Sequence, residues 1–248
     1  MKNYHFKIIV CCYNVEKWIA TNIKSIKKQT HDNFHCIIVD AASSDKTVVK
    51  AKQLIEDDDR FEIIVNDERK FALQNIYESV HYSNASDEDI ITTVDGDDWL
   101  YNEKALEIVN KFYNDNPEIL LTYGNYVFYP DGRDSELKAY PPDITASRNY
   151  RKYKWLASHL RTYKFKLFKH LKKEDLIASW SGKFYDMAYD MPLMYPMLEM
   201  CGDRWKFMPD ILYVYNIYNP LNENKVNIPA IERVDNEVRN KKKYEVIF

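Results

Sequence analysis

The chain has 248 residues, 46% of them hydrophobic, which is enough for one large α/β domain with its own core. Its 35 basic and 38 acidic side chains give a formal net charge of -3, which excludes a global attraction to nucleic acid or to an anionic membrane. Apolar runs fall short of the roughly 20 residues that span a bilayer, and the start lacks signal-peptide features. We therefore expect a soluble, cytoplasmic protein without a membrane span. Its four cysteines, which have no zinc-ligand spacing, are expected to be free thiols: Cys11, Cys12, Cys36 and Cys201.

Short apolar runs rich in β-branched residues recur in the first 100 residues, with polar turns and helix-like patterns between them. In the first predicted helix Trp18, Ile19, Ile23 and Ile26 recur at helical spacing, and Asn14 is placed to cap it. Alternating strands and helices predict a Rossmann-like α/β fold, because parallel strands need a crossover between them. The strands are predicted at 6–12, 35–39, 61–65 and 90–94, and two further helices at 45–56 and 71–82.

The second half of the chain is less regular. Residues 129–147 contain Pro130, Gly132, Pro141 and Pro142, which predict a loop and a candidate lid. Residues 148–173 hold ten Lys or Arg and no acidic residue, interleaved with aromatics, so a local basic patch is expected there. The last helix is weakly amphipathic, which favours either a homodimer contact or a frayed tail. Helices are predicted at 103–113, at 185–200 and from 229 onward, and strands at 119–128 and 207–215.

Three polar clusters follow predicted strands at the point where each strand ends. Tyr13 and Asn14 follow the first strand, Asp40 follows the second, and the run 95–98 follows the fourth. In parallel sheets ligands bind beyond the carboxyl ends of the strands, so we expect these clusters to converge on one edge. No G-x-G-x-x-G and no P-loop motif follows any of the strands, which argues against dinucleotide binding and P-loop chemistry.

The acidic run is the strongest single signal. Asp95, Asp97 and Asp98 are three carboxylates within four residues, and Mg²⁺ and Mn²⁺ prefer carboxylate and phosphate oxygens as ligands. A metal held there would offset the charge on a departing nucleoside diphosphate, and Gly96 would let the backbone approach the ligand. The alternative is an acidic turn or a helix N-cap, which also favours Asp.

Several segments in order resemble glycosyltransferase family 2, over residues 6–100. The resemblance rests on Tyr13-Asn14 after the first strand, on a Ser-Ile-x-x-Gln-Thr-like segment at 25–30, on the segment Ile-Ile-Val-Asp-Ala-Ala-Ser-Ser-Asp-Lys-Thr at 37–47, and on Asp95 to Trp99. It implies a GT-A fold with a mixed, mainly parallel sheet flanked by helices. It also implies a single domain over 1–248, with a nucleotide-sugar-binding half at 1–100, an acceptor half at 101–228 and a C-terminal helix or tail at 229–248.

What the resemblance implies for the site is a nucleoside-diphosphate sugar, usually UDP-linked, with Mn²⁺ or Mg²⁺. Tyr13 and Asn14 would line the base, Asp40 would accept from the uracil imide, Asp95 would hold the ribose, and Asp97 would bind the metal. Asp98 is an alternative ligand or a supporting group.

Two departures from the family pattern bear on the donor site. The family often has a Gly-Gly pair near the third helix and an Arg-Asn pair within it, whereas residues 67–75 keep Asn75 and contain no glycine. Arg69 or Lys70 would therefore contact the nucleotide in another way. Ala41 replaces the second acid of the family's Val-Asp-Asp-Gly-Ser element, which weakens any role for that position.

In the second half the family places an acidic pair at a helix start, with the second acid as acceptor base. Tyr189 stands where the first acid is expected, so Asp190 alone carries over, and Asp186 is its rival. In the basic stretch, His159 is a candidate metal ligand and Arg161 a candidate diphosphate ligand; a solvated basic face with a packed His is the alternative. Segments 194–200 and 211–222 are also similar to small family 2-like transferases of large DNA viruses and some bacteria, a group connected with collagen-like acceptors.

The sequence therefore predicts a metal-dependent transfer of a hexose, with glucose or galactose favoured, from a UDP-sugar to a hydroxyl of a glycan or glycoprotein. If the source is viral, the location would be the host cytoplasm or the virion. One rival is a nucleotidyltransferase on a similar sheet, although residues 11–14 are not the glycine-rich basic loop it needs. Another rival is a non-catalytic module that binds nucleic acid through residues 148–173.

Overall fold

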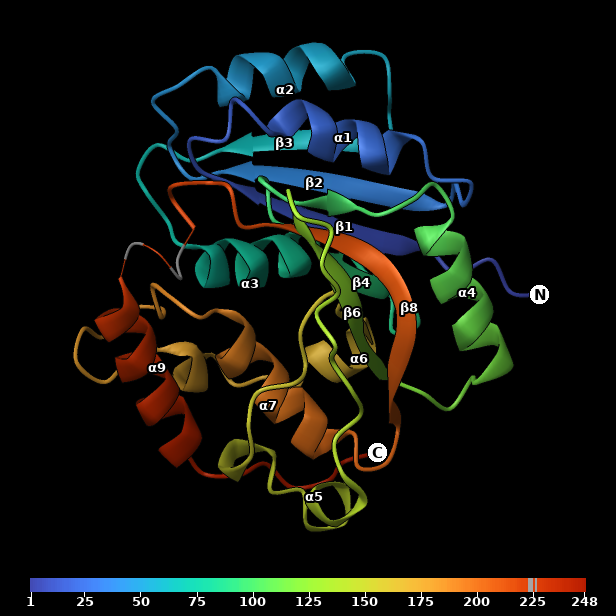
Figure 1. Ribbon diagram of the computed structural model, residues 1–248, viewed down its shortest axis with the longest axis vertical. Coiled ribbons are helices and arrows are strands. Elements are labelled where there is room, and N and C mark those ends of the chain that lie inside the picture. The colour runs from blue at the N-terminus through green and yellow to red at the C-terminus, as the bar shows by residue number, and fades with distance from the viewer. Residues whose placement is uncertain (223–224, 226) are drawn as a thin grey trace.

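A computed structural model describes residues 1–222, 225 and 227–248, and an eight-stranded sheet runs through this described part (Figure 1). The strand order is β3-β2-β1-β4-β7-β6-β8-β5, so strands from both predicted halves share one sheet. The strands are β1 Phe6–Cys12, β2 Phe34–Asp40, β3 Phe61–Val65, β4 Ile90–Thr93, β5 Trp99–Leu100, β6 Leu121–Tyr129, β7 Thr162–Lys164 and β8 Trp205–Asn216.

The sheet is mixed and mainly parallel, which confirms the predicted fold class. Strands β3, β2, β1 and β4 are parallel to one another, and β6 is parallel to β8. Strand β7 pairs antiparallel with β4 and with β6, and β5 pairs antiparallel with β8. Because Cys12 is level with Asp40 in the β1–β2 register, the ends of these strands meet at one edge, as predicted.

Helices cover both faces of the sheet (Figure 1). Alternate residues of β1 point to opposite sides, so Ile8 and Val10 join the core under one helix layer and Ile9 joins the core under the other. One layer contains α1 Ile19–Lys27, α2 Thr47–Ile55 and α4 Ala105–Asp115. The other contains α3 Ala72–Tyr82, α6 Phe165–Phe168, α7 Asp190–Met200 and α9 Ile228–Asn240.

Three predicted elements differ from the structure. Helix α1 begins at Ile19, and Asn14 does not cap it; the Asn14 side-chain oxygen instead accepts from the Ser44 backbone N–H at 2.8 Å. The predicted loop at 129–147 ends in a short helix, α5 Pro142–Ser147. Helix α7 begins at Asp190 rather than at 185, since Ala188 has a φ of 47°, which a right-handed helix cannot contain.

Strands β5 and β7 were not predicted. They contain two and three residues, too few for an alternating pattern to be visible in the sequence. Strand β7 lies inside the basic stretch and joins the two parts of the sheet between β4 and β6.

Among the described residues, no helix has both the length and the apolar character that crossing a membrane requires. All four cysteines are free; three are buried and Cys11 is half-buried.

Three of the ten cations in the basic stretch are buried, while five others are exposed, so only part of the predicted basic patch lies on the surface. Arg151 is buried and forms a two-point ion pair with the buried Glu199 of α7, with N–O distances of 2.6 and 2.8 Å. Its remaining guanidinium nitrogen donates to the Val238 backbone oxygen of α9 at 2.5 Å. Arg161 and Lys164 are also buried, at 1% exposure each. The stretch therefore ties the two C-terminal helices to the rest of the molecule.

Glu199→Ala is expected to lower the free energy of unfolding by about 3–5 kcal/mol, because it leaves the Arg151 guanidinium buried without its partner. Urea unfolding followed by circular dichroism measures the change. Glu232→Ala, which alters an exposed carboxylate on α9, is the matched control and should change stability by less than about 0.5 kcal/mol. Equal effects of the two substitutions would contradict a structural role for this ion pair.

Candidate active site

A cleft of about 860 Å³ lies beyond the carboxyl ends of the parallel strands. It is lined from both halves of the chain, by the end of β1, the residues after β4, the start of α3, Tyr126 of β6, the segment 155–161 before β7, the residues leading into α7, and the end of β8 with the residues that follow it. Eleven of the candidate site residues singled out from the sequence line it: Tyr13, Asn14, Arg69, Lys70, Asp95, Asp97, Asp98, His159, Arg161, Asp186 and Asp190. Asp40 and Gly96 are not among the lining residues.

The predicted base-binding residues gather where β1 and β2 end. The Arg69 guanidinium lies 3.8 Å from the centre of the Tyr13 ring, in cation–π contact. Asn14 has a φ of 51° and is held by Ser43 and Ser44. Asp40 is fully buried; its Oδ2 accepts from the Ser43 backbone N–H at 2.8 Å. Asp40 Oδ1 is buried and has no hydrogen-bond partner in the described part of the chain.

The two cations considered for the nucleotide differ in their surroundings. The Lys70 ammonium pairs with Glu78 of α3 at 2.9 Å, although the residue lines the cleft. Arg69 also lines the cleft and stacks on Tyr13 and, at 4.9 Å, on Phe71. Arg69 is therefore the better placed of the two beside the base-binding residues.

Gly96 has a packing role that the sequence did not reveal. A Cβ atom on Gly96 would lie 2.7 Å from Cys12 Sγ and 2.8 Å from the Cys11 backbone oxygen, closer than any side chain permits. Its N–H donates to that same oxygen at 2.9 Å. Glycine is thus required because the acidic loop crosses the end of β1. The close approach that Gly96 permits is to the β1 backbone and Cys12, not to a ligand as the sequence predicted.

The acidic loop is fixed by residues distant in sequence. The Asn22 side-chain amide of α1 donates to the backbone oxygens of Asp95 and Asp98, both at 2.9 Å. Asp98 accepts from the Tyr213 hydroxyl and from the Asn216 backbone N–H, both at 2.7 Å. The Asp97 carboxylate accepts from the Asn219 side chain at 2.6 Å. Strand β8 and the residues that follow it therefore set the orientation of the loop.

The electrostatics of the loop favour a bound cation. Burial, with a smaller contribution from the nearby Asp97 carboxylate and partly opposed by Arg161, raises the pKa of Asp95 to about 6. Burial also raises the pKa of Asp97, and burial with the like charges of Asp97 and Asp95 raises that of Asp98 well above its usual range. A divalent cation bound there would stabilise the ionised forms of these three carboxyl groups.

The structure brings together a possible metal-binding group of two aspartates and a histidine. Ligand atoms of Asp95, Asp98 and His159 lie within 4.8 Å of one another. The His159 ring stacks on Tyr213 at 4.2 Å, and its Nδ1 is buried with no partner among the described residues. Burial lowers the pKa of His159 well below its usual value, so the ring is neutral, the form that ligates metals. These donors fit Mn²⁺; Asp97, also predicted as a ligand, lies outside this group.

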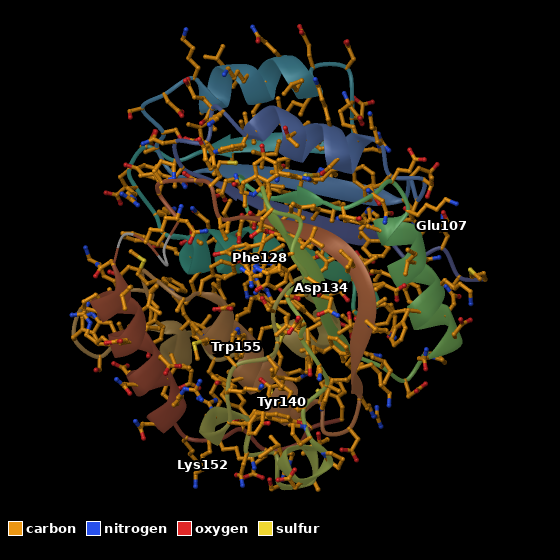
Figure 2. All side chains as sticks on the ribbon, viewed as in Figure 1. Glu107, Phe128, Asp134, Tyr140, Lys152 and Trp155 are labelled. Carbon is orange, nitrogen blue, oxygen red and sulfur yellow. The ribbon has the colours of Figure 1, made fainter. Side chains whose placement is uncertain are left out.

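Two residues that contact the candidate site residues, Tyr189 and Trp155, were given no functional role in the sequence analysis. The Tyr189 hydroxyl donates to Asp95, at 2.8 and 3.0 Å to its two oxygens, and accepts from Arg161 at 2.7 Å. The Trp155 indole N–H donates to Asp190 Oδ2 at 2.9 Å, and Arg161 lies 3.4 Å from the same oxygen (Figure 2 labels Trp155). Tyr189 could have been found, since it occupies the place of the expected acid. Trp155 gave no signal, because 35 residues separate it from Asp190.

The model of the family described as glycosyl transferase family 2 matches residues 7–188, most of the chain. The chain belongs to glycosyltransferase family 2. The N-terminal resemblance is confirmed by this match, whereas the similarity to viral transferases stays a prediction.

Curated relatives agree with the family. A glucosyltransferase of Escherichia coli, WfgD, described as UDP-Glc:alpha-D-GlcNAc-diphosphoundecaprenol beta-1,3-glucosyltransferase, is 31% identical over 51% of this chain and 47% of its own length. The glycosyltransferase GlyG of Streptococcus pneumoniae is 24% identical over 84% of this chain and 69% of its own. The chain spans about half the length of the first curated relatives that it matches, 47% and 46%.

Solved structures confirm the GT-A fold of this family 2 chain. A mannosyltransferase of Pyrobaculum calidifontis, solved with GDP-Man and Mn²⁺, matches with a TM-score of 0.63 at 15% identity, over 97% of this chain and 66% of that one. Staphylococcus aureus TarS, solved with UDP-GlcNAc, matches with a TM-score of 0.62 at 15% identity, over 87% of this chain and 59% of that one. At such identities the likeness concerns the fold alone.

Proposed function

We propose that this family 2 protein transfers a hexose, glucose or galactose, from a UDP-sugar to a hydroxyl of a glycan or glycoprotein, with Mn²⁺ or Mg²⁺ bound. The observation that carries the proposal is the convergence of Asp95, Asp97, Asp98, His159, Arg161 and Asp190 on one cleft. The E. coli relative is named for a UDP-glucose donor, and the two solved structures hold a nucleotide sugar, one of them with Mn²⁺.

The donor would lie along the ends of β1, β2 and β4. Tyr13 would pack on the base, and the buried Oδ1 of Asp40 would accept its imide N–H. Asp95 would bind the ribose hydroxyls, sharing its oxygens with Tyr189. Arg161, buried and already bonded to Tyr189, would direct its remaining donor capacity toward the diphosphate, since its Nε has no partner among the described residues.

A divalent cation would supply Lewis-acid stabilisation of the negative charge on the departing diphosphate. Asp97, or the group of Asp95, Asp98 and His159, would hold it. The acceptor oxygen attacks the anomeric carbon as the bond from that carbon to the diphosphate oxygen breaks. The acceptor proton passes to Asp190, whose Trp155 contact fixes its orientation, and the family resemblance implies inversion at the anomeric carbon.

The structure counts against part of each rival function. The basic stretch 148–173 buries Arg151, Arg161 and Lys164, which are therefore unavailable to bind nucleic acid, whereas Lys152, Lys154, Lys169, Lys172 and Lys173 are exposed. Residues 11–14 form the end of β1 and a turn, with no glycine-rich basic loop for a nucleotidyltransferase. We further propose a single domain over 1–248 with the donor half at 1–100, a cytoplasmic location, and a homodimer. Collagen-like proteins are one acceptor class to test.

A panel of nucleotide sugars, followed by thermal shift with and without Mn²⁺, tests this function. UDP-glucose or UDP-galactose with Mn²⁺ should raise the melting temperature, because a ligand that binds only the folded state stabilises it by mass action. At 100 times the dissociation constant the gain is about 2.7 kcal/mol. GDP-mannose is the matched control ligand. An equal shift for GDP-mannose, or no shift with any nucleotide sugar, would overturn the donor assignment.

A further inference from the structure

A row of aromatic rings leads out of the cleft from His159. We call it the aromatic strip: Tyr126 and Phe128 of β6 and Tyr215 of β8. Tyr126 meets the edge of His159 at 5.8 Å, and Tyr215 lies at 5.7 Å from it in a stacked orientation. The ring centres of Tyr126 and Phe128 are 5.1 Å apart. The ring centre of Tyr215 lies 5.5 Å from that of Tyr126 and 6.0 Å from that of Phe128. Phe128 is labelled in Figure 2.

The strand geometry places these rings on one face. Tyr126 and Phe128 are two residues apart on β6, so both point to the same side of the sheet, and Phe128 is level with Tyr215 across the β6–β8 pairing. Each of the three side chains is only partly buried. Tyr126 and Tyr215 line the cleft and Phe128 does not, so the strip runs from inside the cleft toward its rim.

Inside the cleft the polar groups beside the strip are neutral amides and hydroxyls; at the rim the Arg133 guanidinium lies 4.3 Å from the centre of the Phe128 ring and pairs with Asp131 at 3.7 Å, so its charge is balanced. Ser158, Asn219 and Asn222 line the same part of the cleft, and the Asn222 amide contacts the Tyr215 hydroxyl at 2.9 Å. Of the cations that line the cleft, Arg69 and Lys70 lie on the donor side, near the start of α3, and Arg161 is already bonded to Tyr189 and Asp190. Partly exposed aromatic rings flanked by neutral hydrogen-bonding groups match a ligand that has both C–H faces and hydroxyls.

We propose that the aromatic strip is the acceptor subsite and that it binds the terminal pyranose units of a neutral oligosaccharide. This inference rests on the proposed function and names the acceptor class for that same cleft. The C–H bonds of a pyranose carry partial positive charge, so they pack on the electron-rich ring faces of Tyr126 and Phe128. The ring hydroxyls would bond to Ser158 and Asn222. The innermost sugar would then lie next to His159, beside the acidic loop.

Binding of the protein to an array of defined neutral oligosaccharides, with UDP and Mn²⁺ present, tests the proposal. Phe128→Ala and Phe128→Leu should each weaken binding about 10-fold, since both remove the ring, whereas Phe128→Tyr should keep it. The three variants should bind UDP as the original protein does, because Phe128 does not line the donor site. Tyr82→Ala, at an aromatic that is 57% exposed at the end of α3, is the matched control and should leave glycan binding unchanged.

The outcomes separate this inference from the function on which it rests. If UDP and Mn²⁺ do not bind, the proposed function fails. If UDP binds but no neutral oligosaccharide does, or if Phe128→Leu binds glycans as well as Phe128→Tyr, the acceptor subsite is overturned while the donor site stands. Preferential binding of anionic glycans or of undecorated peptides would likewise overturn the assignment to a neutral sugar.

Discussion

Asp190→Asn is expected to lower the rate of sugar transfer by about 10²–10⁴-fold, the usual contribution of a positioned general base. The amide has the shape of the carboxylate and its oxygen can still accept from the Trp155 indole at the same place, so the side chain should keep its orientation. It cannot take the acceptor proton at neutral pH. Donor affinity should change far less than the transfer rate, because the only proposed donor-site contact of Asp190 is the 3.4 Å approach of Arg161.

The transfer rate is measured with radiolabelled sugar passing from UDP-glucose or UDP-galactose to a glycan acceptor. Donor affinity is measured by thermal shift with the same donor. Asp186→Asn is the matched control, since Asp186 also lines the cleft and its Oδ1 has no hydrogen-bond partner among the described residues. A large loss for Asp186→Asn together with full activity of Asp190→Asn would move the role of base to Asp186.

Asp97→Ala, or EDTA, is expected to reduce UDP release from UDP-sugar by about 100-fold or more. The reason is that a divalent cation contributes several kcal/mol to stabilising the departing diphosphate, and each 1.36 kcal/mol is a factor of ten in rate. Asp97 is a direct candidate ligand because its carboxylate lines the cleft and bonds Asn219, a neutral partner. In Asp97→Ala, a higher Mn²⁺ concentration should be needed to reach half of the maximal rate.

Asn219→Ala is the control for this prediction, because it removes the partner of Asp97 without removing the carboxylate, and its loss should be much smaller. His159→Gln tests the alternative ligand group of Asp95, Asp98 and His159. If His159→Gln abolishes the Mn²⁺ dependence and Asp97→Ala preserves it, this second group is the metal site. Release of UDP that persists through both EDTA and Asp97→Ala would discard the metal assignment altogether.

The N-terminal half of the fold was predictable because its signals are local. Strands β1 and β3 have the predicted bounds, Phe6–Cys12 and Phe61–Val65, since buried parallel strands are short continuous apolar runs that polar turns interrupt. The second half was less predictable. In that half and at its border, the short strands β5 and β7 are stabilised by pairing with strands far away in the sequence, and Ala188 delays α7 through a left-handed backbone conformation.

The sequence by itself determined the family and indicated candidate donor-side residues, because Asp40 and the run 95–98 each follow directly after an apolar strand, and parallel strands bring such ends to one edge. Only the tertiary structure decided which groups surround these carboxylates. It placed His159 beside Asp98, and Trp155 and Tyr189 on Asp190 and Asp95. It also gave Gly96 its reason in the Cys12 contact. Hydrogen bonds between residues tens of positions apart depend on how the chain packs, and no local pattern records that.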